Sequence, residues 1–183
     1  SMKGLKISTV NCGIKYKNRD DLLLVTFDAA ANVAGVFTQS SMPAAPVVWC
    51  KKNIDKGSAR ALIVNAGNAN AFTGKSGEEV VEKTVNAIVK ELECKQEEVF
   101  VSSTGVIGEI LKAELIEAQI PQMVKNPITD KSLWNAASRA IMTTDTKPKL
   151  VKKTCQINGA EVSLVGFAKG SGMIAPNMAT MLG

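Results

Sequence analysis

The chain has 183 residues, 45% of them hydrophobic and 21% charged, a composition that supports a packed core and excludes a disordered polypeptide. Histidine is absent, which excludes Ser-His-Asp triads, Cys-His dyads and histidine-ligated zinc. The net charge of +5 is mild and only 4% of the residues are aromatic, so we expect no nucleic-acid binding. This length predicts a single domain over residues 1–183.

The cysteines and the hydropathy pattern bear on metal binding and on location. Four cysteines lie far apart without a CxxC pair, so we expect reduced thiols and no metal site. The N-terminus shows no signal-peptide core, and no apolar run approaches the roughly 20 residues needed to span a bilayer. We therefore expect a cytoplasmic protein without membrane contact.

The first half of the chain contains three apolar, β-branched runs that predict strands. Residues 22–27 and 32–38 are separated by Asp-Ala-Ala-Ala, which predicts two neighbouring strands. A third strand is predicted at residues 61–65, and the small residues of 66–74 (AGNANAFTG) predict a loop after it.

A helix is predicted directly after this loop. Ser76 is followed three positions later by Glu79, the pattern of a capping box at a helix start. One apolar stripe then follows at helical spacing, formed by Val81, Val85, Ile88 and Leu92. The opposite face is charged, as expected for a helix that covers a sheet.

The second half continues the alternation of strands and helices. Residues 98–103 predict a strand that runs directly into Thr104 and Gly105. Residues 113–124 and 131–142 predict helices. The closing elements are predicted to be a hairpin of strands 149–157 and 160–167, because the Asn158-Gly159 pair between them suits a type I′ turn.

This order of elements predicts an α/β fold in which helices cover a layered sheet. The basic group Lys147, Lys149, Lys152 and Lys153 is interpreted as the solvated face of a hairpin strand, and the alternative is that it steers anionic substrates. After Phe167 the sequence continues as AKGSGMIAPNMATMLG and stops in an apolar stretch without a closing helix. We therefore expect more polypeptide to complete the domain.

The closing segment has few reactive side chains, of which Lys169 and Thr180 are the strongest. By itself it would be a buried glycine-rich loop. In the absence of histidine, one way to activate a threonine hydroxyl is to use its own α-amine as the base, which requires cleavage of the preceding peptide bond. An α-amine titrates near pH 7.7 to 8.0 and can accept a proton at neutral pH.

Several long motifs, in a fixed order, resemble the ornithine acetyltransferase family, the bifunctional glutamate N-acetyltransferases of arginine biosynthesis. These motifs are VAGVFT with AAPV, IVNAGNANAFTG, VSSTGVIGE, AIMTTDTKPK and KGSGMIAPNMATML. Together they span most of the chain. The resemblance implies a layered sheet-and-helix sandwich of the self-processing N-terminal-threonine type, in which this chain is the α-chain portion and a β chain completes the fold.

The resemblance also implies a reaction. A precursor would cut itself between Ala179 and Thr180, and the new N-terminal Thr180 would be the nucleophile. It would take acetyl from N2-acetylornithine and pass it to glutamate through an acetyl-threonine intermediate. Family α chains end at the alanine, whereas this chain carries Thr180 and three further residues. While the Ala179–Thr180 bond is intact, the Thr180 nitrogen is an amide without useful basicity.

Further site residues follow from the same resemblance. Thr104 and Gly105 match the oxyanion-hole pair, and Thr143 and Lys169 match substrate-binding positions, together with Thr180. The alternatives are that Thr104 and Gly105 only make a tight turn, and that Thr144 or Asp145 shapes the turn before Pro148. The choice between Thr143 and Thr144 stays open. The asparagines of the AGNAN loop, Asn65, Asn68 and Asn70, are interpreted as mainly structural.

The family resemblance implies an α2β2 heterotetramer without a metal or an organic cofactor, with acetyl-CoA as a possible second acetyl donor. Two other functions stay open on the residues alone. One is a self-processing amidohydrolase or aminopeptidase that passes acyl groups to water. The other is a binding module without catalysis, whose glycine-rich tail contacts a partner.

Overall fold

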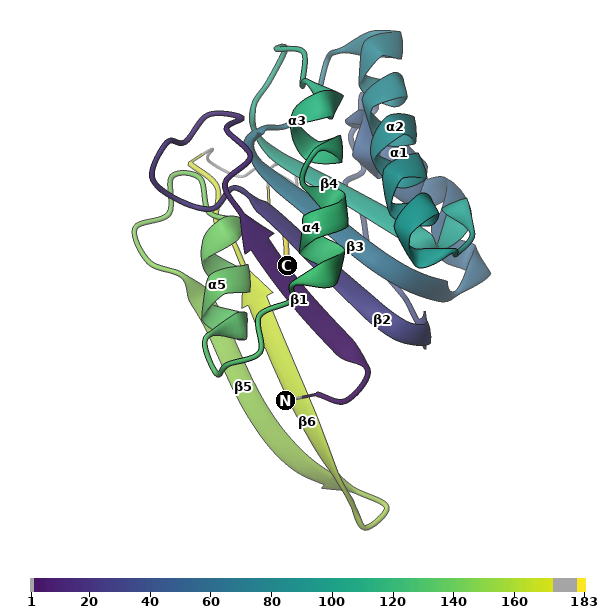
Figure 1. The fold of residues 1–183 in the computed structure, drawn as a ribbon, viewed down its shortest axis with the longest axis vertical. Coiled ribbons are helices and arrows are strands. Elements are labelled where there is room, and N and C mark those ends of the chain that lie inside the picture. Colours follow the sequence, from purple (N-terminus) through teal and green to yellow (C-terminus); the bar gives the residue numbers. More distant parts are fainter. Residues whose placement is uncertain (1, 173–180) are drawn as a thin grey trace.

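The computed structural model of the protein describes residues 2–172 and 181–183. In this part of the chain a four-stranded and a two-stranded sheet are combined with helices (Figure 1). The strands are β1 Leu5–Val10, β2 Leu22–Asn32, β3 Ser58–Asn68, β4 Val99–Val106, β5 Lys149–Ile157 and β6 Ala160–Ala168. The helices are α1 Ala45–Asn53, η1 Ile54–Lys56, α2 Gly74–Leu92, η2 Gln96–Glu98, α3 Ala113–Glu117, α4 Ile120–Lys125 and α5 Leu133–Ala140.

The larger sheet has the order β1-β2-β3-β4. The first two pairings are antiparallel, and β3 pairs with β4 in parallel through the crossover helix α2. Successive residues of a strand point to opposite faces of its sheet. Leu22 and Leu24 therefore pack on one face of β2, while Leu23 and Val25 pack on the other. Both faces of this sheet need a covering layer.

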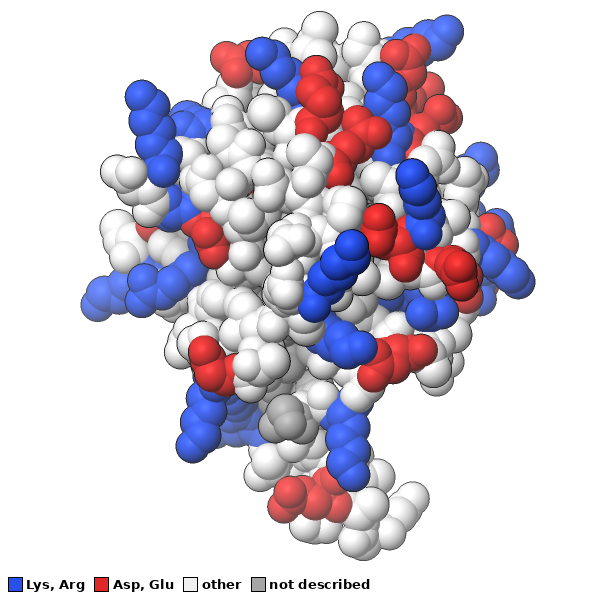
Figure 2. Space-filling view, in the orientation of Figure 1, with Lys and Arg blue, Asp and Glu red and all other residues white. Residues whose placement is uncertain are grey.

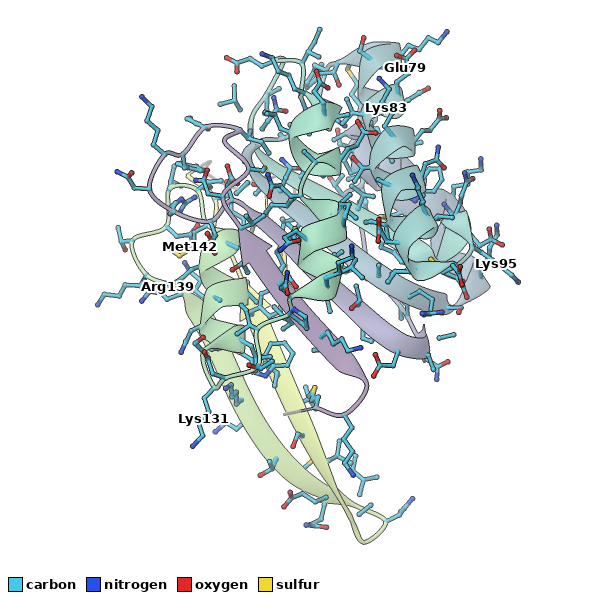
Figure 3. The ribbon with its side chains drawn as sticks, in the orientation of Figure 1. Glu79, Lys83, Lys95, Lys131, Arg139 and Met142 are labelled. Atoms are coloured by element: carbon cyan, nitrogen blue, oxygen red, sulfur yellow. The ribbon has the colours of Figure 1, made fainter. Side chains whose placement is uncertain are left out.

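Helices α2, α3 and α4 cover the first face. Val81, Val85 and Ile88 of α2 are at most 2% exposed and pack in the same cluster as Leu24. This confirms the predicted apolar stripe. Glu79 and Lys83 are exposed on the outer side of the helix (Figure 3), so the amphipathic pattern places this helix at the surface with one face buried.

Helix α5 and the β5-β6 hairpin lie against the opposite face. Trp134 of α5 is buried, and its ring lies 6.2 Å from that of Phe167 on β6. Asn158 and Gly159 both have positive φ, 49° and 80°, which confirms the predicted hairpin turn. The predicted α/β layered architecture is confirmed, and the hairpin projects beyond the sheet (Figure 1).

The prediction of a separate strand over residues 32–38 is wrong. Strand β2 continues through Asp-Ala-Ala-Ala to Asn32, with a shift of register between Thr26 and Ala31. Asn32 pairs with Ser58, the first residue of β3. Because β3 provides no further partner, the strand ends there, and residues 33–40 have no regular structure.

The predicted capping box is also wrong. Helix α2 begins at Gly74, so Ser76 and Glu79 lie inside its first turns. The loop before the helix supplies its own polar contacts: the Thr73 hydroxyl donates to Asn70 Oδ1, and the Asn70 amide donates to the carbonyl oxygen of Gly77. The observed N-cap is Thr73, so the helix begins three residues before the position that the sequence pattern indicates.

The predicted helix over residues 113–124 is two short helices, α3 and α4. Pro121 lacks a backbone N–H and is compatible with the first turn of a helix but not with its interior. The helix therefore ends at Glu117, and a new one begins at Ile120.

Strand β1 at the sheet edge was not predicted from the sequence.

The surface of the described residues carries charges of both signs. On the face shown in Figure 2, Lys and Arg side chains are interspersed with Asp and Glu, so no field of a single sign develops there. Within the described ranges, no helix combines the length and apolar character that a membrane span requires.

Candidate functional site

Thr104 and Gly105 lie near the carboxyl end of β4, directly beside the corresponding end of β3. In the parallel ladder Thr104 pairs with Ala66, and Gly105 pairs with Gly67. A β-carbon on Gly105 would lie 2.4 Å from the carbonyl carbon of Gly67, and Gly105 has a φ of +130°. Both the close approach and the dihedral angle require glycine. The two strands therefore present backbone and a hydroxyl here, in place of bulky side chains.

Lys169 directly follows β6 and extends to the Thr104 hydroxyl. Its Nζ donates a hydrogen bond to Thr104 Oγ1 at 3.1 Å, although the two residues are 65 positions apart in the sequence. Lys169 is 2% exposed. Burial lowers the pKa of this lysine, while the nearby carboxylate of Asp145 opposes that effect. The structure thus brings together two predicted site residues and places a buried cationic group beside Thr104.

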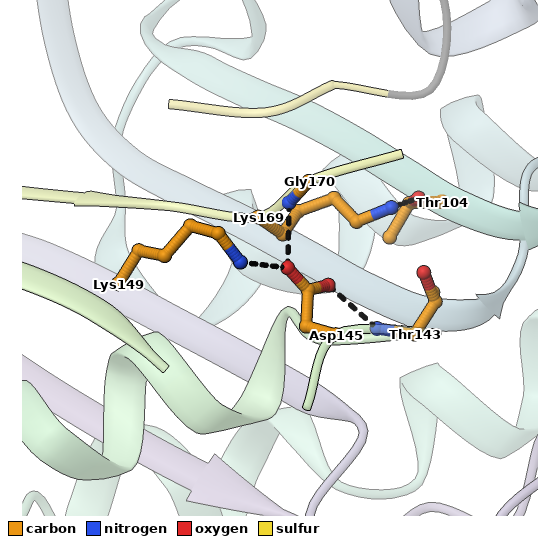
Figure 4. A network of polar contacts seen from close by, with 6 residues as sticks. All are labelled: Thr104, Thr143, Asp145, Lys149, Lys169 and Gly170. Atoms are coloured by element: carbon orange, nitrogen blue, oxygen red, sulfur yellow. Dashed lines mark hydrogen bonds and ion pairs between the residues drawn. The ribbon is translucent and has the colours of Figure 1, made fainter. Parts of the chain in front are cut away.

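A carboxylate organises the backbone around Lys169 (Figure 4). Asp145 Oδ1 accepts a hydrogen bond from the backbone N–H of Gly170 at 2.7 Å and an ion-pair contact from Lys149 Nζ. Its other oxygen lies 3.5 Å from the backbone nitrogen of Thr143. Burial raises the pKa of Asp145, but the contacts from Lys149, Gly170 and Thr143 outweigh it and hold the pKa below its usual value.

The Asp145 network predicts an acid-sensitive part of the stability. The pKa of Asp145 is lower in the folded chain than in the unfolded chain, so its ionised carboxylate stabilises the folded state. This contribution to the free energy of unfolding is complete above the ordinary aspartate pKa. It is lost as the pH falls through the lowered pKa of the folded chain. We expect Asp145→Asn to cost about 2 kcal/mol at neutral pH and progressively less in acid. Urea unfolding at a series of pH values measures this.

Asp28→Asn is the matched control for that measurement. The Asp28 side chain is 55% exposed and pairs with Lys6 at 2.7 Å, so its loss should cost less than about 1 kcal/mol. An equal loss of stability for both variants, or a loss for Asp145→Asn that does not change with pH, would contradict the role given to Asp145.

The structure distinguishes the surroundings of Thr143 and Thr144. Thr143 is half-buried and belongs to the Asp145 network through its backbone, whereas Thr144 is exposed. Thr144 also lies near the segment that follows β6, because its Oγ1 would be 3.6 Å from a β-carbon on Gly172. The choice between Thr143 and Thr144 as the substrate-binding residue therefore stays a prediction. Asp145 shapes the turn before Pro148, as one alternative predicted, and also holds Gly170. Sequence reasoning missed that second contact, since the two residues are 25 positions apart.

The asparagines of the AGNAN loop have structural roles, as interpreted from the sequence. The Asn65 amide donates to the carbonyl oxygen of Asn68, and the Asn68 amide donates to the carbonyl oxygen of Glu109. Ser103 in turn donates to Asn65 Oδ1 at 2.5 Å. The bond between Ser103 and Asn65 joins β4 to β3 next to Thr104, and the bond between Asn68 and Glu109 joins the end of β3 to the segment that follows β4.

The buried thiols have raised pKa values. Burial, reinforced by the neighbouring Asp21 carboxylate, raises the pKa of Cys12 to about 12, and burial raises that of Cys50 to about 11. Such thiols stay protonated at neutral pH and are poor nucleophiles. These two cysteines are therefore part of the core and not of a reactive site.

A cleft of about 380 Å³ lies just beyond Gly105. Its lining includes Lys15, Gly67, Asn68, Val106 and Lys112. None of Thr104, Thr143 and Lys169 lines it, so the cleft adjoins the predicted site on the Gly67 side without containing it. Sequence reasoning did not find this cleft, because its walls come from segments that are distant in the chain.

These features define an α/β protein in which a parallel strand end presents a hydroxyl and a glycine, and a buried lysine that follows β6 contacts the hydroxyl. The match to the model of the ArgJ family extends over residues 6–183, and the chain belongs to that family. It is 49% identical over 182 residues to the arginine biosynthesis bifunctional protein ArgJ of Rhizobium meliloti and 48% identical to that of Agrobacterium fabrum. The match covers 100% of this chain and 44% of each relative.

Solved structures are similar to the whole described fold. The ArgJ crystal structure from Bacillus halodurans has a TM-score of 0.88 at 37% identity, covering 97% of this chain and 92% of that one. The structure of ornithine acetyltransferase complexed with ornithine from Mycobacterium tuberculosis has a TM-score of 0.81 at 34% identity, covering 95% and 92%. The resemblance noted from the motifs is confirmed. The chain spans less than half the length of the curated relatives it matches.

Proposed function

We propose that this chain is the α-chain portion of a self-cleaving acetyltransferase of arginine biosynthesis. The intact enzyme transfers acetyl from N2-acetylornithine to glutamate, and cleavage between Ala179 and Thr180 exposes the nucleophile. Both of these residues lie outside the described part of the chain. The proposal rests on the family membership and, within the structure, on the hydrogen bond from buried Lys169 to the Thr104 hydroxyl.

The proposed chemistry proceeds in two half-reactions. The α-amine of Thr180 takes the proton of its own hydroxyl as Oγ1 attacks the acetyl carbonyl, and the tetrahedral intermediate carries an oxyanion. Thr104 and the backbone N–H of Gly105 stabilise that oxyanion. Ornithine leaves with the proton, and the amine of glutamate then attacks the acetyl ester and regenerates the hydroxyl.

The surroundings of Lys169 support this assignment. Leu182, two residues beyond the proposed nucleophile, forms an antiparallel bridge with Lys169. Described residues on either side of the proposed cleavage point are therefore tied to the same site. Lys169 would pair with a substrate carboxylate, and Thr143 would contact substrate from the Asp145 turn.

The family resemblance further supports an α2β2 assembly in the cytoplasm that needs neither a metal nor an organic cofactor. Acetyl-CoA would be an additional donor in a bifunctional member. The other part of the precursor, the β chain, would supply the remaining substrate contacts.

One experiment tests the proposed function on the full-length protein. We expect mass spectrometry after incubation to show two chains, the second beginning with Thr180. We expect the same material to form N-acetylglutamate from N2-acetylornithine and glutamate faster than it releases acetate. Excess acetate would indicate the hydrolase instead. A persistent single chain without turnover would remove the reason to assign Thr180 as a nucleophile and would favour the binding module.

A further inference from the structure

The Thr104 hydroxyl is a buried donor whose hydrogen has no acceptor among the residues that the structure describes. Thr104 is 1% exposed, and within those residues its side chain takes part in one hydrogen bond, which it accepts from Lys169 Nζ. The neighbouring Ser103 differs, because its hydroxyl donates to Asn65 Oδ1 at 2.5 Å. Buried polar groups in folded proteins are nearly always hydrogen-bonded. The hydrogen of the Thr104 hydroxyl is therefore available to an acceptor that a ligand brings.

Lys169 determines where that hydrogen can point. A threonine hydroxyl carries one hydrogen and two lone pairs, whereas a lysine ammonium has donors and no acceptor. The contact of 3.1 Å between Lys169 Nζ and Thr104 Oγ1 therefore occupies a lone pair of the oxygen, and the hydroxyl hydrogen must lie on another side of it (Figure 4). Without the ammonium, the hydroxyl could rotate freely among its staggered positions. The lysine thus restricts the orientation of the hydroxyl.

The backbone around Lys169 is held on both sides, so the position of its ammonium is defined. The Lys169 N–H donates to the carbonyl oxygen of Leu182 at 2.9 Å, and the N–H of Gly170 donates to Asp145 Oδ1 at 2.7 Å. The side chain then extends from the end of β6 to the end of β4 and is 2% exposed. A group that is fixed by surrounding contacts in this way needs little reorganisation when a ligand binds.

The ammonium also places a positive charge close to the proposed oxyanion. An oxygen that accepts the Thr104 hydrogen at the usual O–H···O distance of about 2.8 Å would lie within about 6 Å of Lys169 Nζ. The negative charge on this oxygen develops in the transition state and is absent from the bound substrate. The attraction therefore lowers the barrier more than it strengthens binding.

We propose that Lys169 is a positioning residue of the proposed oxyanion hole, which directs the Thr104 hydroxyl hydrogen toward the reacting carbonyl oxygen and polarises that hydroxyl. This inference rests on the proposed function, in which Thr104 and Gly105 form the oxyanion hole. It differs from the pairing of Lys169 with a substrate carboxylate, which acts on binding. An ammonium has three donors, so the two roles are compatible, and an acetyl donor without a carboxylate separates them.

The ester p-nitrophenyl acetate is such a donor. It acetylates a nucleophilic hydroxyl and releases p-nitrophenolate, whose absorbance is followed in single turnovers of the cleaved full-length protein. We expect Lys169→Met to slow this acetylation by about 10- to 100-fold, less than the loss of an oxyanion donor itself. Methionine retains most of the length of the lysine side chain and removes the ammonium. Rates are expressed per Thr180 terminus, counted by mass spectrometry.

A double-mutant cycle shows whether the effect passes through Thr104. Once Thr104→Val has removed the hydroxyl, only the longer-range effect of the charge remains, so we expect Lys169→Met to slow acetylation by less than about threefold. Lys169→Arg keeps a charged donor, and its rate should stay within about fivefold of that of the unchanged protein. Lys131→Met is the matched control for the loss of one positive charge. Lys131 is exposed (Figure 3), and this variant should react as the unchanged protein does.

Two kinetic outcomes would overturn the inference. One is that Lys169→Met slows acetylation equally with and without Thr104→Val. The other is that it leaves the reaction with p-nitrophenyl acetate unchanged and raises only the KM for N2-acetylornithine, which would make Lys169 a carboxylate-binding residue alone.

A second measurement applies if Lys169→Met prevents cleavage. The same cycle is then followed by urea unfolding of the uncleaved precursor, made with Thr180→Ala. Shifts of the unfolding midpoint that are coupled between the two positions support the contact, and additive shifts would mean that the hydrogen bond does not form, which also overturns the inference. Failure of the proposed function gives a different result, because the unchanged protein would then not be acetylated at Thr180 by either donor.

Discussion

Replacing Thr104 by valine is expected to lower kcat for the proposed acetyl transfer by about 10²- to 10³-fold, the usual cost of removing one oxyanion donor, which is the role proposed for its hydroxyl. Valine has nearly the shape of threonine but lacks the hydroxyl. Thr104 is 1% exposed, so the substitution leaves the surface unchanged. Since the oxyanion exists only in the transition state and the intermediate, KM should change little.

The measurement is steady-state kinetics of the full-length protein with N2-acetylornithine and glutamate. Thr104→Ser is the control, because it keeps a hydroxyl at the position that Lys169 Nζ contacts. Serine should retain most of the activity, within about tenfold, since it preserves the donor while losing only a methyl group. A valine variant as active as the serine variant would show that Thr104 only makes a turn.

Loss of the hydroxyl also removes one hydrogen-bond acceptor from Lys169. This lysine is buried, and its charged form is already disfavoured by desolvation. A loss of folding stability of about 1–3 kcal/mol is therefore expected for valine. Unfolding curves measured under the assay conditions separate this loss of stability from the catalytic effect. If the variant is still folded at the assay temperature, the fall in kcat is due to catalysis and not to unfolding.

Local patterns predicted the elements that position the site. The apolar run at 61–65, the stripe of α2 and the run at 98–103 are short-range features. The first two fall within the observed β3 and α2, and the third overlaps β4, which begins one residue later at Val99. The strand expected at 32–38 depends instead on where a distant partner begins. Because Ser58 opens β3, the ladder stops at Asn32, a limit that no pattern within 22–38 reveals.

In the candidate site, too, local features could be predicted from the sequence and long-range contacts could not. Thr104 and Gly105 could be identified from the family motifs, and their place at a strand end from the apolar run before them. The contact of Lys169 with Thr104 and that of Asp145 with Gly170 join residues 65 and 25 positions apart. Such contacts depend on how the hairpin packs across the sheet, which periodicity does not encode.

The ends of β3 and β4 are the point on which the site's geometry depends. Gly105 and Gly67 pair directly, and the hydrogen bonds of Asn65 and Asn68 hold the adjoining loop. The geometry of the site therefore depends on the close approach of the β3 and β4 backbones at Gly67 and Gly105. A side chain introduced at that point should disturb the fold as well as the proposed oxyanion hole.

Gly105→Ala is the direct test of this dependence. The added methyl group would lie 2.4 Å from the carbonyl carbon of Gly67 and 2.6 Å from the nitrogen of Asn68, both of them backbone atoms. The φ of +130° is also unfavourable for alanine. Strain and overlap together should cost at least about 3 kcal/mol of unfolding free energy, measured by urea denaturation.

Gly108→Ala separates the two contributions. Gly108 also has positive φ, +84°, but no atom lies within 4 Å of a β-carbon there. Its replacement should therefore cost only the conformational strain, about 1 kcal/mol. If the two alanine variants were equally stable, the contact between the ends of β3 and β4 would be looser than the structure describes, and Gly105 would be needed for its dihedral angle alone. A much larger loss at Gly105 means that the site tolerates no side chain between the two strand ends.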